Sequence, residues 1–126
     1  MIKTVYTDKA PAAIGPYSQA KVVGNLVFTS GQIAINPASN EVEAITIEAQ
    51  TTQVCENIKN LLEAAGSSLE SVVKTTCFLK NMEDFAAFNT IYAEYFTSKP
   101  ARSCVAAKQL PKDVLVEVET IAVIKE

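Results

Sequence analysis

One residue stands out for the chemistry that it could do, because it is the only arginine of the chain. Ten of the eleven cationic side chains are lysines, and the eleventh is Arg102. A planar, permanently charged guanidinium binds a carboxylate through two parallel hydrogen bonds, which a lysine ammonium does not reproduce. An arginine at the start of a strand can equally form an ordinary salt bridge at the surface or at an interface. Both interpretations of Arg102, as a ligand-binding and as a structural residue, stay open at this point.

Two glutamates, Glu117 and Glu119, lie two residues apart in a segment otherwise rich in valine and isoleucine. Alternate residues of a strand share one face. Such a pair is typical of a half-exposed polar face, or of a face that lines a wet cavity or a subunit contact, where one of the carboxylates can orient water by hydrogen bonding. If the strand that starts at Arg102 forms a hairpin with this one about residues 110 and 111, Arg102 lies near Glu119 and Cys104 near Glu117. All four side chains are then expected on one face of the sheet.

Three further candidates carry weaker signals. Cys104 is a potential nucleophile, although a small apolar packing role fits a thiol without a neighbouring base better. Tyr17 follows the rigid pair Gly15-Pro16, so its ring either faces a ligand or lies at a rim. Ser30 and Gly31 offer a hydroxyl and an unshielded backbone N–H to a ligand, or simply end a strand.

Composition excludes several classes of function. The chain has no histidine, which removes imidazole bases, histidine-containing metal sites and Ser-His or Cys-His pairs. Its three cysteines are widely spaced, as in neither a disulfide framework nor a zinc site, and fit reduced thiols in the cytosol. A net charge of −3 argues against a nucleic-acid partner. Because no signal peptide or membrane span is evident, we expect a cytoplasmic protein.

The elements that position these residues follow from hydrophobic periodicity, within one domain over residues 1–126. Helices are predicted over residues 47–65, between Thr46 as N-cap and Gly66 as stop, and after Asn81 as N-cap. Extended segments are predicted over residues 3–7, 17–23, 26–30, 72–79, 102–107 and 114–124, and residues 36–40 as a loop. This order predicts an α+β fold, a mainly antiparallel or mixed sheet with two helices packed on one face.

Several segments together carry a family resemblance. They are Ala12-Ala13-Ile14-Gly15-Pro16-Tyr17-Ser18-Gln19, Thr29-Ser30-Gly31-Gln32, Asn57-Ile58, residues 85–89 with Tyr92, and Pro100-Ala101-Arg102-Ser103-Cys104 followed by Leu110-Pro111 and Val116-Glu117-Val118-Glu119. With them the sequence resembles, over essentially its whole length, the Rid family of YjgF-like (RidA-type) enamine/imine deaminases. The resemblance implies a chorismate-mutase-like fold and a homotrimer with three clefts at the subunit interfaces.

The resemblance also implies an activity. Deaminases of this family hydrolyse 2-aminoacrylate and related 2-imino acids, released by pyridoxal-phosphate enzymes such as dehydratases, to 2-keto acids and ammonia. They need no metal or organic cofactor. By motif match, Arg102 binds the substrate carboxylate and Glu117 holds the attacking water or relays a proton. The same match places further residues in the cleft, namely Tyr17, Ser30, Gly31, Asn89 and Cys104.

One segment departs from the family pattern. Residues 97–100 form a shorter connection than in typical deaminases, and Lys99 stands where an aromatic residue usually precedes the proline. This difference bears on substrate preference and on the level of activity. Two other functions remain alternatives: a carboxylate-binding regulatory or chaperone-like protein without turnover, and an endoribonuclease or translation inhibitor. The missing histidine, the single arginine and the negative net charge argue against an endoribonuclease or translation inhibitor.

Overall fold

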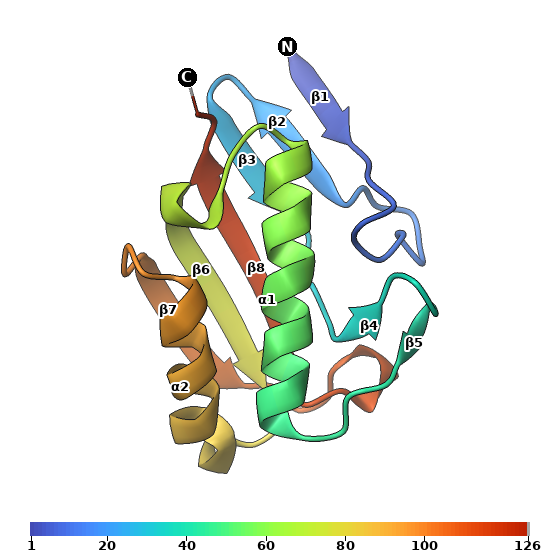
Figure 1. Ribbon diagram of the computed structural model, residues 1–126, viewed down its shortest axis with the longest axis vertical. Coiled ribbons are helices and arrows are strands. Elements are labelled where there is room, and N and C mark those ends of the chain that lie inside the picture. The colour runs from blue at the N-terminus through green and yellow to red at the C-terminus, as the bar shows by residue number, and fades with distance from the viewer. Residues whose placement is uncertain (126) are drawn as a thin grey trace.

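The chain folds into a six-stranded sheet with both helices on one of its faces (Figure 1). The computed structural model describes residues 1–125. The strands are β1 (Ile2–Val5), β2 (Ala20–Val23), β3 (Leu26–Thr29), β6 (Val72–Leu79), β7 (Ala101–Ala106) and β8 (Val116–Val123), and the helices are α1 (Ile47–Ala64) and α2 (Phe85–Tyr95). The spatial order is β1-β2-β3-β8-β6-β7. This mixed sheet with two helices on one face confirms the predicted architecture.

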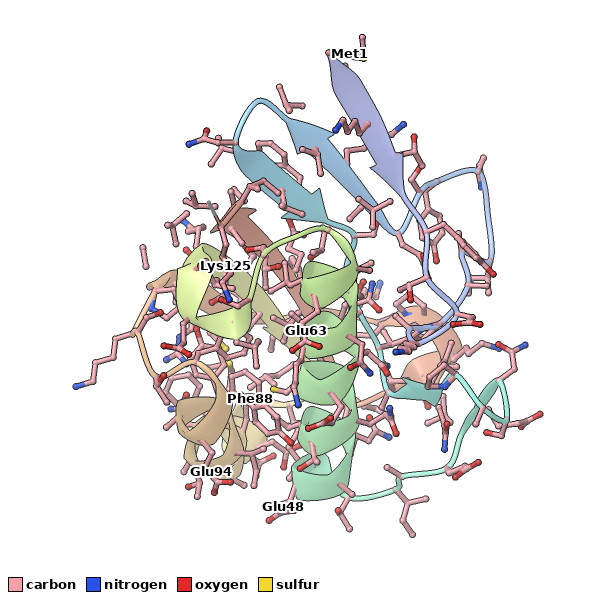
Figure 2. All side chains as sticks on the ribbon, turned by 45° about the horizontal axis from the view of Figure 1, so that its top comes forward. Met1, Glu48, Glu63, Phe88, Glu94 and Lys125 are labelled. Atoms are coloured by element: carbon pink, nitrogen blue, oxygen red, sulfur yellow. The ribbon has the colours of Figure 1, made fainter. Side chains whose placement is uncertain are left out.

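Helix α1 begins and ends where the residue types predict. The Thr46 hydroxyl accepts a hydrogen bond from the Ala49 N–H at 3.1 Å, which satisfies one of the free N–H groups of the first turn. Gly66 adopts a φ of +86°, a left-handed conformation that ends the helix. The helix buries an apolar stripe against the sheet, which includes Val54, Ile58, Leu61 and Leu62. Figure 2 shows Glu48 and Glu63 of α1 on its outer side, where both are exposed.

Helix α2 packs an aromatic stripe against the sheet and α1. The rings of Phe88 and Tyr92 lie 5.4 Å apart between centroids, and those of Tyr92 and Phe96 stack at 4.5 Å. Phe88 lies between the two helices in Figure 2. The predicted cap is wrong in detail. Because a single 3-10 turn, Met82–Asp84, precedes the helix, α2 starts at Phe85, and the Asn81 side chain forms no capping hydrogen bond.

Strand β7 does not pair with β8, so the predicted terminal hairpin is wrong. β7 returns from α2 and lies parallel to β6 at the edge of the sheet, with Arg102 opposite Thr75. β8 instead enters between β3 and β6 and pairs with both in antiparallel fashion. The physical reason is the β6-α2-β7 connection: a crossover helix joins neighbouring strands in parallel orientation, which fills the edge of β6 that a hairpin would have used for β7.

This pairing places the candidate residues on opposite faces of the sheet, which corrects the expectation of one shared face. Arg102 and Cys104 align with the buried Thr75 and Cys77 of β6, so they lie on the side of the helices. On β8 the residues of that side are Val116, Val118, Thr120 and Ala122, all buried. The intervening residues of β8, Glu117 and Glu119, therefore face the opposite, open side. Arg102 pairs with neither glutamate in the described chain.

Residues 1–42 contribute the loops and strands that lie beside Glu117 on the open face of the sheet. Gly24, with a φ of +59°, turns β2 into β3 as predicted. The predicted strand 17–23 starts only at Ala20, so Tyr17 belongs to the preceding loop. The expected loop at 36–40 is the turn of a small hairpin between β4 (Ile35–Asn36) and β5 (Glu41–Val42). Within residues 1–125, no helix combines the length and the apolar character that crossing a membrane requires.

Candidate active site

One hollow gathers most of the predicted site residues on the side of Glu117. We call it the acidic hollow; its volume is about 360 Å³ and it is lined by Ile14, Tyr17, Ser30, Gly31, Ile33, Pro111 and Glu117. Four of these were predicted from the sequence as site residues: Tyr17, Ser30, Gly31 and Glu117. The remaining lining is apolar, so the glutamate faces a largely non-polar wall.

Gly31 and Glu117 are in such close contact that Glu117 can keep its present position only beside a glycine. A Cβ atom built on Gly31 would lie 2.9 Å from Cδ of Glu117 and closer still to one of its carboxylate oxygens. The backbone bridge between Gln32 and Val118 holds the two segments together, with the Gln32 N–H donating to the Val118 carbonyl at 2.8 Å. The absent side chain of Gly31 thus leaves the space that the Glu117 carboxylate occupies.

The environment of Glu117 favours its protonated form. Partial burial, and secondarily the negative charge of Glu119, raise the pKa of the Glu117 carboxyl above its usual value. A carboxylate of raised pKa is a stronger base, and it gives up its proton less readily than an exposed glutamate. These are the properties needed by a group that takes a proton from water and returns it to a leaving nitrogen.

Ser30 and Tyr17 are each held by hydrogen bonds to the backbone. The Ser30 hydroxyl donates to the Ser18 carbonyl at 2.6 Å, and the Ser30 N–H donates to the Gln19 carbonyl at 2.9 Å. The Tyr17 hydroxyl accepts from the Ile14 N–H at 3.3 Å, and about half of the tyrosine is exposed. Since the Ser30 proton is engaged, its hydroxyl meets a ligand as a hydrogen-bond acceptor.

Sequence reasoning missed the residue that holds this loop in place. Gln19 is 3% exposed and its amide nitrogen donates to the carbonyls of Thr7, Ala10 and Pro11, while its oxygen accepts from the Thr7 N–H. One side chain thereby fixes the start of the loop that carries Tyr17. The available signal was a glutamine just before an apolar strand, because a buried amide in that position requires backbone partners.

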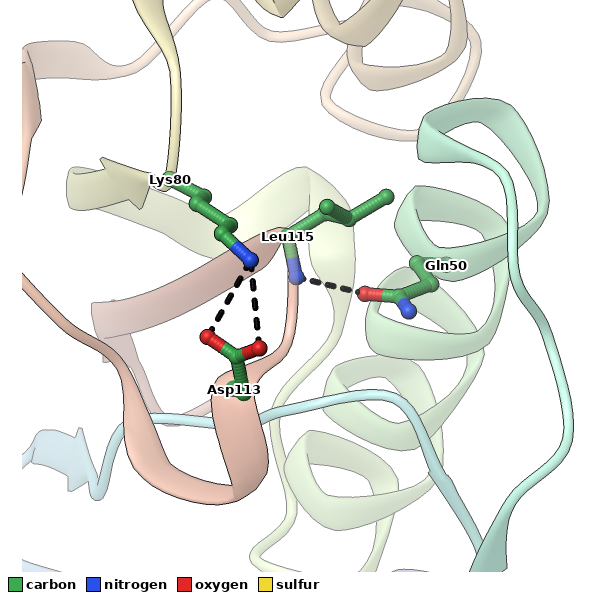
Figure 3. A network of polar contacts seen from close by, with 4 residues as sticks. All are labelled: Gln50, Lys80, Asp113 and Leu115. Carbon is green, nitrogen blue, oxygen red and sulfur yellow. Dashed lines mark hydrogen bonds and ion pairs between the residues drawn. The ribbon is translucent and has the colours of Figure 1, made fainter.

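The connection before β8 is fixed from two sides (Figure 3). The Gln50 amide oxygen of α1 accepts from the Leu115 N–H at 2.8 Å. Lys80 forms an ion pair with Asp113 at 3.1 Å. The ion pair is exposed and contributes little, but the bond from the buried Gln50 fixes the backbone directly before Val116 and Glu117.

A second hollow surrounds Arg102 on the side of the helices. We call it the arginine hollow; its volume is about 350 Å³ and it is lined by Asn89, Tyr92, Ala93, Phe96, Thr97, Lys99, Pro100 and Arg102. Two of the three remaining predicted site residues, Asn89 and Arg102, line this hollow. No aspartate or glutamate is part of this lining.

Arg102 is held by neutral groups. Its Nη1 donates to the Asn89 side-chain oxygen at 2.7 Å. Its guanidinium carbon lies 4.9 Å from the centre of the Tyr92 ring and 5.4 Å from that of Phe85, within cation–π range. In residues 1–125 no carboxylate forms a salt bridge with it. A guanidinium has five N–H donors, so Arg102 is oriented and still has donors to offer to an anion.

Cys104 lies two residues beyond Arg102 on the same strand face but lines neither hollow. Burial raises the pKa of its thiol, and the nearby Arg102 lowers it only in part. A protonated, half-buried thiol fits a packing role better than that of a nucleophile. Among residues 1–125, no group of three or more cysteine, aspartate or glutamate side chains is arranged to hold a metal ion.

Comparisons with known proteins agree on one family. The family model described as Endoribonuclease L-PSP matches residues 7–124. A protein of Escherichia coli strain K12 named 2-iminobutanoate/2-iminopropanoate deaminase is 50% identical over 127 residues, 98% of each chain. A protein of Lactococcus lactis named putative regulator AldR is 51% identical over 125 residues, 98% of this chain and 99% of its own. The crystal structure of Escherichia coli TdcF with bound serine superposes with a TM-score of 0.92 at 42% identity, over 98% and 99% of the two chains.

Proposed function

We propose, because the chain belongs to the endoribonuclease L-PSP family, that it hydrolyses reactive 2-enamine and 2-imino acids to 2-keto acids and ammonia. The relative named for the deamination of 2-iminobutanoate and 2-iminopropanoate supports this reaction. 2-Aminoacrylate, the enamine tautomer of 2-iminopropanoate, is then a substrate, and the expected sources are pyridoxal-phosphate dehydratases in the same cytoplasm.

The observation that carries the proposal is an oriented Arg102 without a carboxylate partner among the described residues. A half-buried cation without a counter-ion is unfavourable unless an anion from outside completes the site. An α-imino acid supplies a planar carboxylate that matches the guanidinium fork. Asn89 and the two aromatic rings then fix the guanidinium, and through it the position of the imine carbon.

We further propose that the complete site forms between two chains of a homotrimer. Arg102 and Glu117 lie on opposite faces of the sheet, in different hollows, so one chain does not bring both to the same small substrate. The open face around Glu117 also exposes apolar side chains, including Phe28 at 40% and Val105 at 50%. Contact between neighbouring copies would cover this face and join the arginine hollow of one copy to the acidic hollow of the next.

The chemistry needs only positioning, water and proton transfer. Arg102 binds the carboxylate, and the Glu117 carboxylate accepts a proton as the oxygen of water attacks the carbon of the protonated imine. The resulting carbinolamine carries hydroxyl and amino groups on that carbon. Glu117 returns the proton to nitrogen, and the C–N bond breaks as the hydroxyl oxygen forms the keto C=O. Ammonia leaves, and the Glu117 carboxylate takes the hydroxyl proton and then releases it to solvent. No step of this route uses a metal or an organic cofactor.

A carboxylate-binding regulator without turnover is the second candidate, which the relative named as a putative regulator favours. Both functions need Arg102, so the discriminating residue is Glu117. Binding alone tolerates Glu117→Gln, an isosteric change, whereas hydrolysis requires the carboxylate as a base. The family description also names an endoribonuclease, but the chain lacks histidine and has one arginine and a net charge of −3.

A coupled assay tests the proposal. A pyridoxal-phosphate dehydratase acting on serine or threonine generates the imine in situ, and keto-acid formation is followed with wild type, Arg102→Ala, Glu117→Gln and no addition. Acceleration by wild type alone supports the deaminase. Absence of acceleration by folded, oligomeric wild type rejects it. In that case, measured binding of a stable 2-keto acid by wild type and Glu117→Gln would favour the regulator.

A further inference from the structure

We propose that Lys99 is a specificity-determining residue that adapts the site to imino acids with a second carboxylate on the side chain. This inference rests on the proposed deaminase function and adds a substrate class, the imines of acidic four- and five-carbon amino acids. Lys99 and Arg102 line the same arginine hollow, three positions apart, so that two cations face one small cavity. The following observations carry the inference.

Lys99 lies in a tight turn whose backbone conformation is more often adopted by glycine. Lys99 has a φ of +55°, and its N–H donates to the Phe96 carbonyl at 3.2 Å, which closes a tight turn after α2. Glycine or asparagine adopts this left-handed conformation at lower cost. The following Pro100 further restricts the backbone. Lys112 has the same φ of +55° but does not line the arginine hollow, so Lys99 is distinguished by its place in that hollow and not by its backbone.

The charge of the hollow supports the same conclusion. Its lining contains the two cations Lys99 and Arg102 and no carboxylate. Within residues 1–125, the salt bridge of the structure joins Lys80 to Asp113, and Lys99 takes part in none. A substrate with one carboxylate neutralises Arg102 and leaves Lys99 unpaired. A dicarboxylic imino acid supplies an anion to each.

The two cations suit different carboxylates of such a substrate. Arg102 is held by Asn89 and two rings and binds in a fixed, bidentate manner, which suits the α-carboxylate next to the reacting carbon. Lys99 is exposed and carries a compact charge on a flexible stem. It can follow a distal carboxylate over a range of side-chain lengths. Lys99, in the short 97–100 connection, therefore adds a flexible cation to the hollow in which Arg102 is the rigid one.

The experiment compares two imines generated in situ by amino-acid oxidases, 2-iminobutanoate and 2-iminoglutarate, with trapping by semicarbazide as the readout. The measured quantity is the ratio of kcat/KM for the dicarboxylic to that for the monocarboxylic imine. Lys99→Ala is expected to lower this ratio about three- to fivefold, the value of an exposed ion pair, and Lys99→Glu to lower it further. Lys99→Arg is expected to keep the wild-type ratio, because it retains the positive charge. The effect of Lys99→Ala should shrink as salt is added.

Lys108→Ala is the matched control, because Lys108 is exposed and lines neither hollow. Its ratio should equal that of wild type. An unchanged ratio in both Lys99→Ala and Lys99→Glu would overturn the inference, as would turnover of 2-iminobutanoate with none of 2-iminoglutarate. Either result leaves the deaminase function intact. A wild type that hydrolyses neither imine rejects the function and the inference together.

Discussion

Gly31 leaves the space into which the carboxylate of Glu117 extends, so a methyl group at position 31 and the present position of Glu117 exclude each other. The group in conflict is the far end of a flexible side chain. Gly31→Ala is therefore expected to fold, with a melting temperature within a few degrees of wild type, while Glu117 is displaced. We expect kcat/KM for 2-iminobutanoate to fall at least about tenfold, because catalysis depends on the position of the base.

Gly24→Ala is the converse control for this prediction. Gly24 has a φ of +59°, and no atom lies within 4 Å of the point that a Cβ would occupy, so alanine strains the turn without touching the site. The variant should lose stability and keep its activity. Equal activity losses in the two glycine variants would show that Gly31 acts only through stability.

The second prediction concerns the shape of the cation. Arg102→Lys keeps the charge but loses the fork, the geometry of the Asn89 bond and the stacking on two rings. We expect kcat/KM to fall about ten- to a hundredfold. Steady-state kinetics in the coupled assay measures it, and near-normal turnover would remove Arg102 from the assigned role.

The third prediction places an anion beside the arginine from within the chain. Asn89→Asp converts the 2.7 Å bond from Arg102 Nη1 into an ion pair that competes with the substrate carboxylate. KM should rise several-fold and the melting temperature should rise or stay constant, whereas Asn89→Ala should raise KM without stabilising the protein. A lower KM in Asn89→Asp would contradict the proposal that Arg102 binds the carboxylate.

The fourth prediction follows from the raised pKa of Glu117, whose ionised form acts as the base. Activity should rise with pH as the carboxyl loses its proton. Glu119→Gln removes the smaller cause of the raised pKa, the neighbouring charge, so the acidic limb of kcat/KM should move to lower pH by a fraction of a unit. Burial, the larger cause, remains. Glu83→Gln, an exposed change in the turn before α2, should leave the limb in place.

The same pKa has a consequence for stability with a definite sign. Because the folded pKa exceeds the unfolded one, ionised Glu117 reduces stability as the pH rises through the folded pKa. Glu117→Gln should therefore melt at a higher temperature than wild type near neutral pH, and the difference should shrink at pH values below the unfolded pKa. A difference that grows on acidification would contradict this sign.

The fifth prediction tests the shared site. Arg102→Ala and Glu117→Gln chains are each expected to be inactive, but a mixture assembled by co-expression should recover activity. In a mixed trimer, one cleft combines Arg102 from one chain with Glu117 from the other. If both residues acted within one chain, the mixture would stay as inactive as its components.

Local signals in the sequence predicted more of the fold than of the site. Thr46 and Gly66 bracket α1, and the apolar run of β6 was predicted to the residue, because caps and periodicity act over a few neighbouring positions. The alternation of β8 was also correct. The predicted partner of β8 was wrong, since strand pairing depends on contacts between distant segments. No local feature of the sequence separates a parallel crossover to β7 from a hairpin.

For the same reason the site residues were predicted by type and not by placement. Tyr17, Ser30, Gly31 and Glu117 do line one hollow, and Asn89 and Arg102 another. Which residues share a hollow follows from the register across β6, which places Thr75 beside Arg102 and Phe78 beside Glu117. No role was assigned to Gln19 from the sequence, because the backbone carbonyls that it binds lie 8 to 12 residues away along the chain.

The position of β8 has a consequence for how the chain folds during its synthesis. Among the six strands of this sheet, β8 is synthesised last, yet it lies in the middle, where it joins β1-β2-β3 to β6-β7. On the ribosome, those two groups of strands have no common strand partner until residues 116–123 leave the exit tunnel. Closure of the sheet therefore waits until β8 has emerged, and a chain truncated before residue 116 would present two open strand edges, those of β3 and β6.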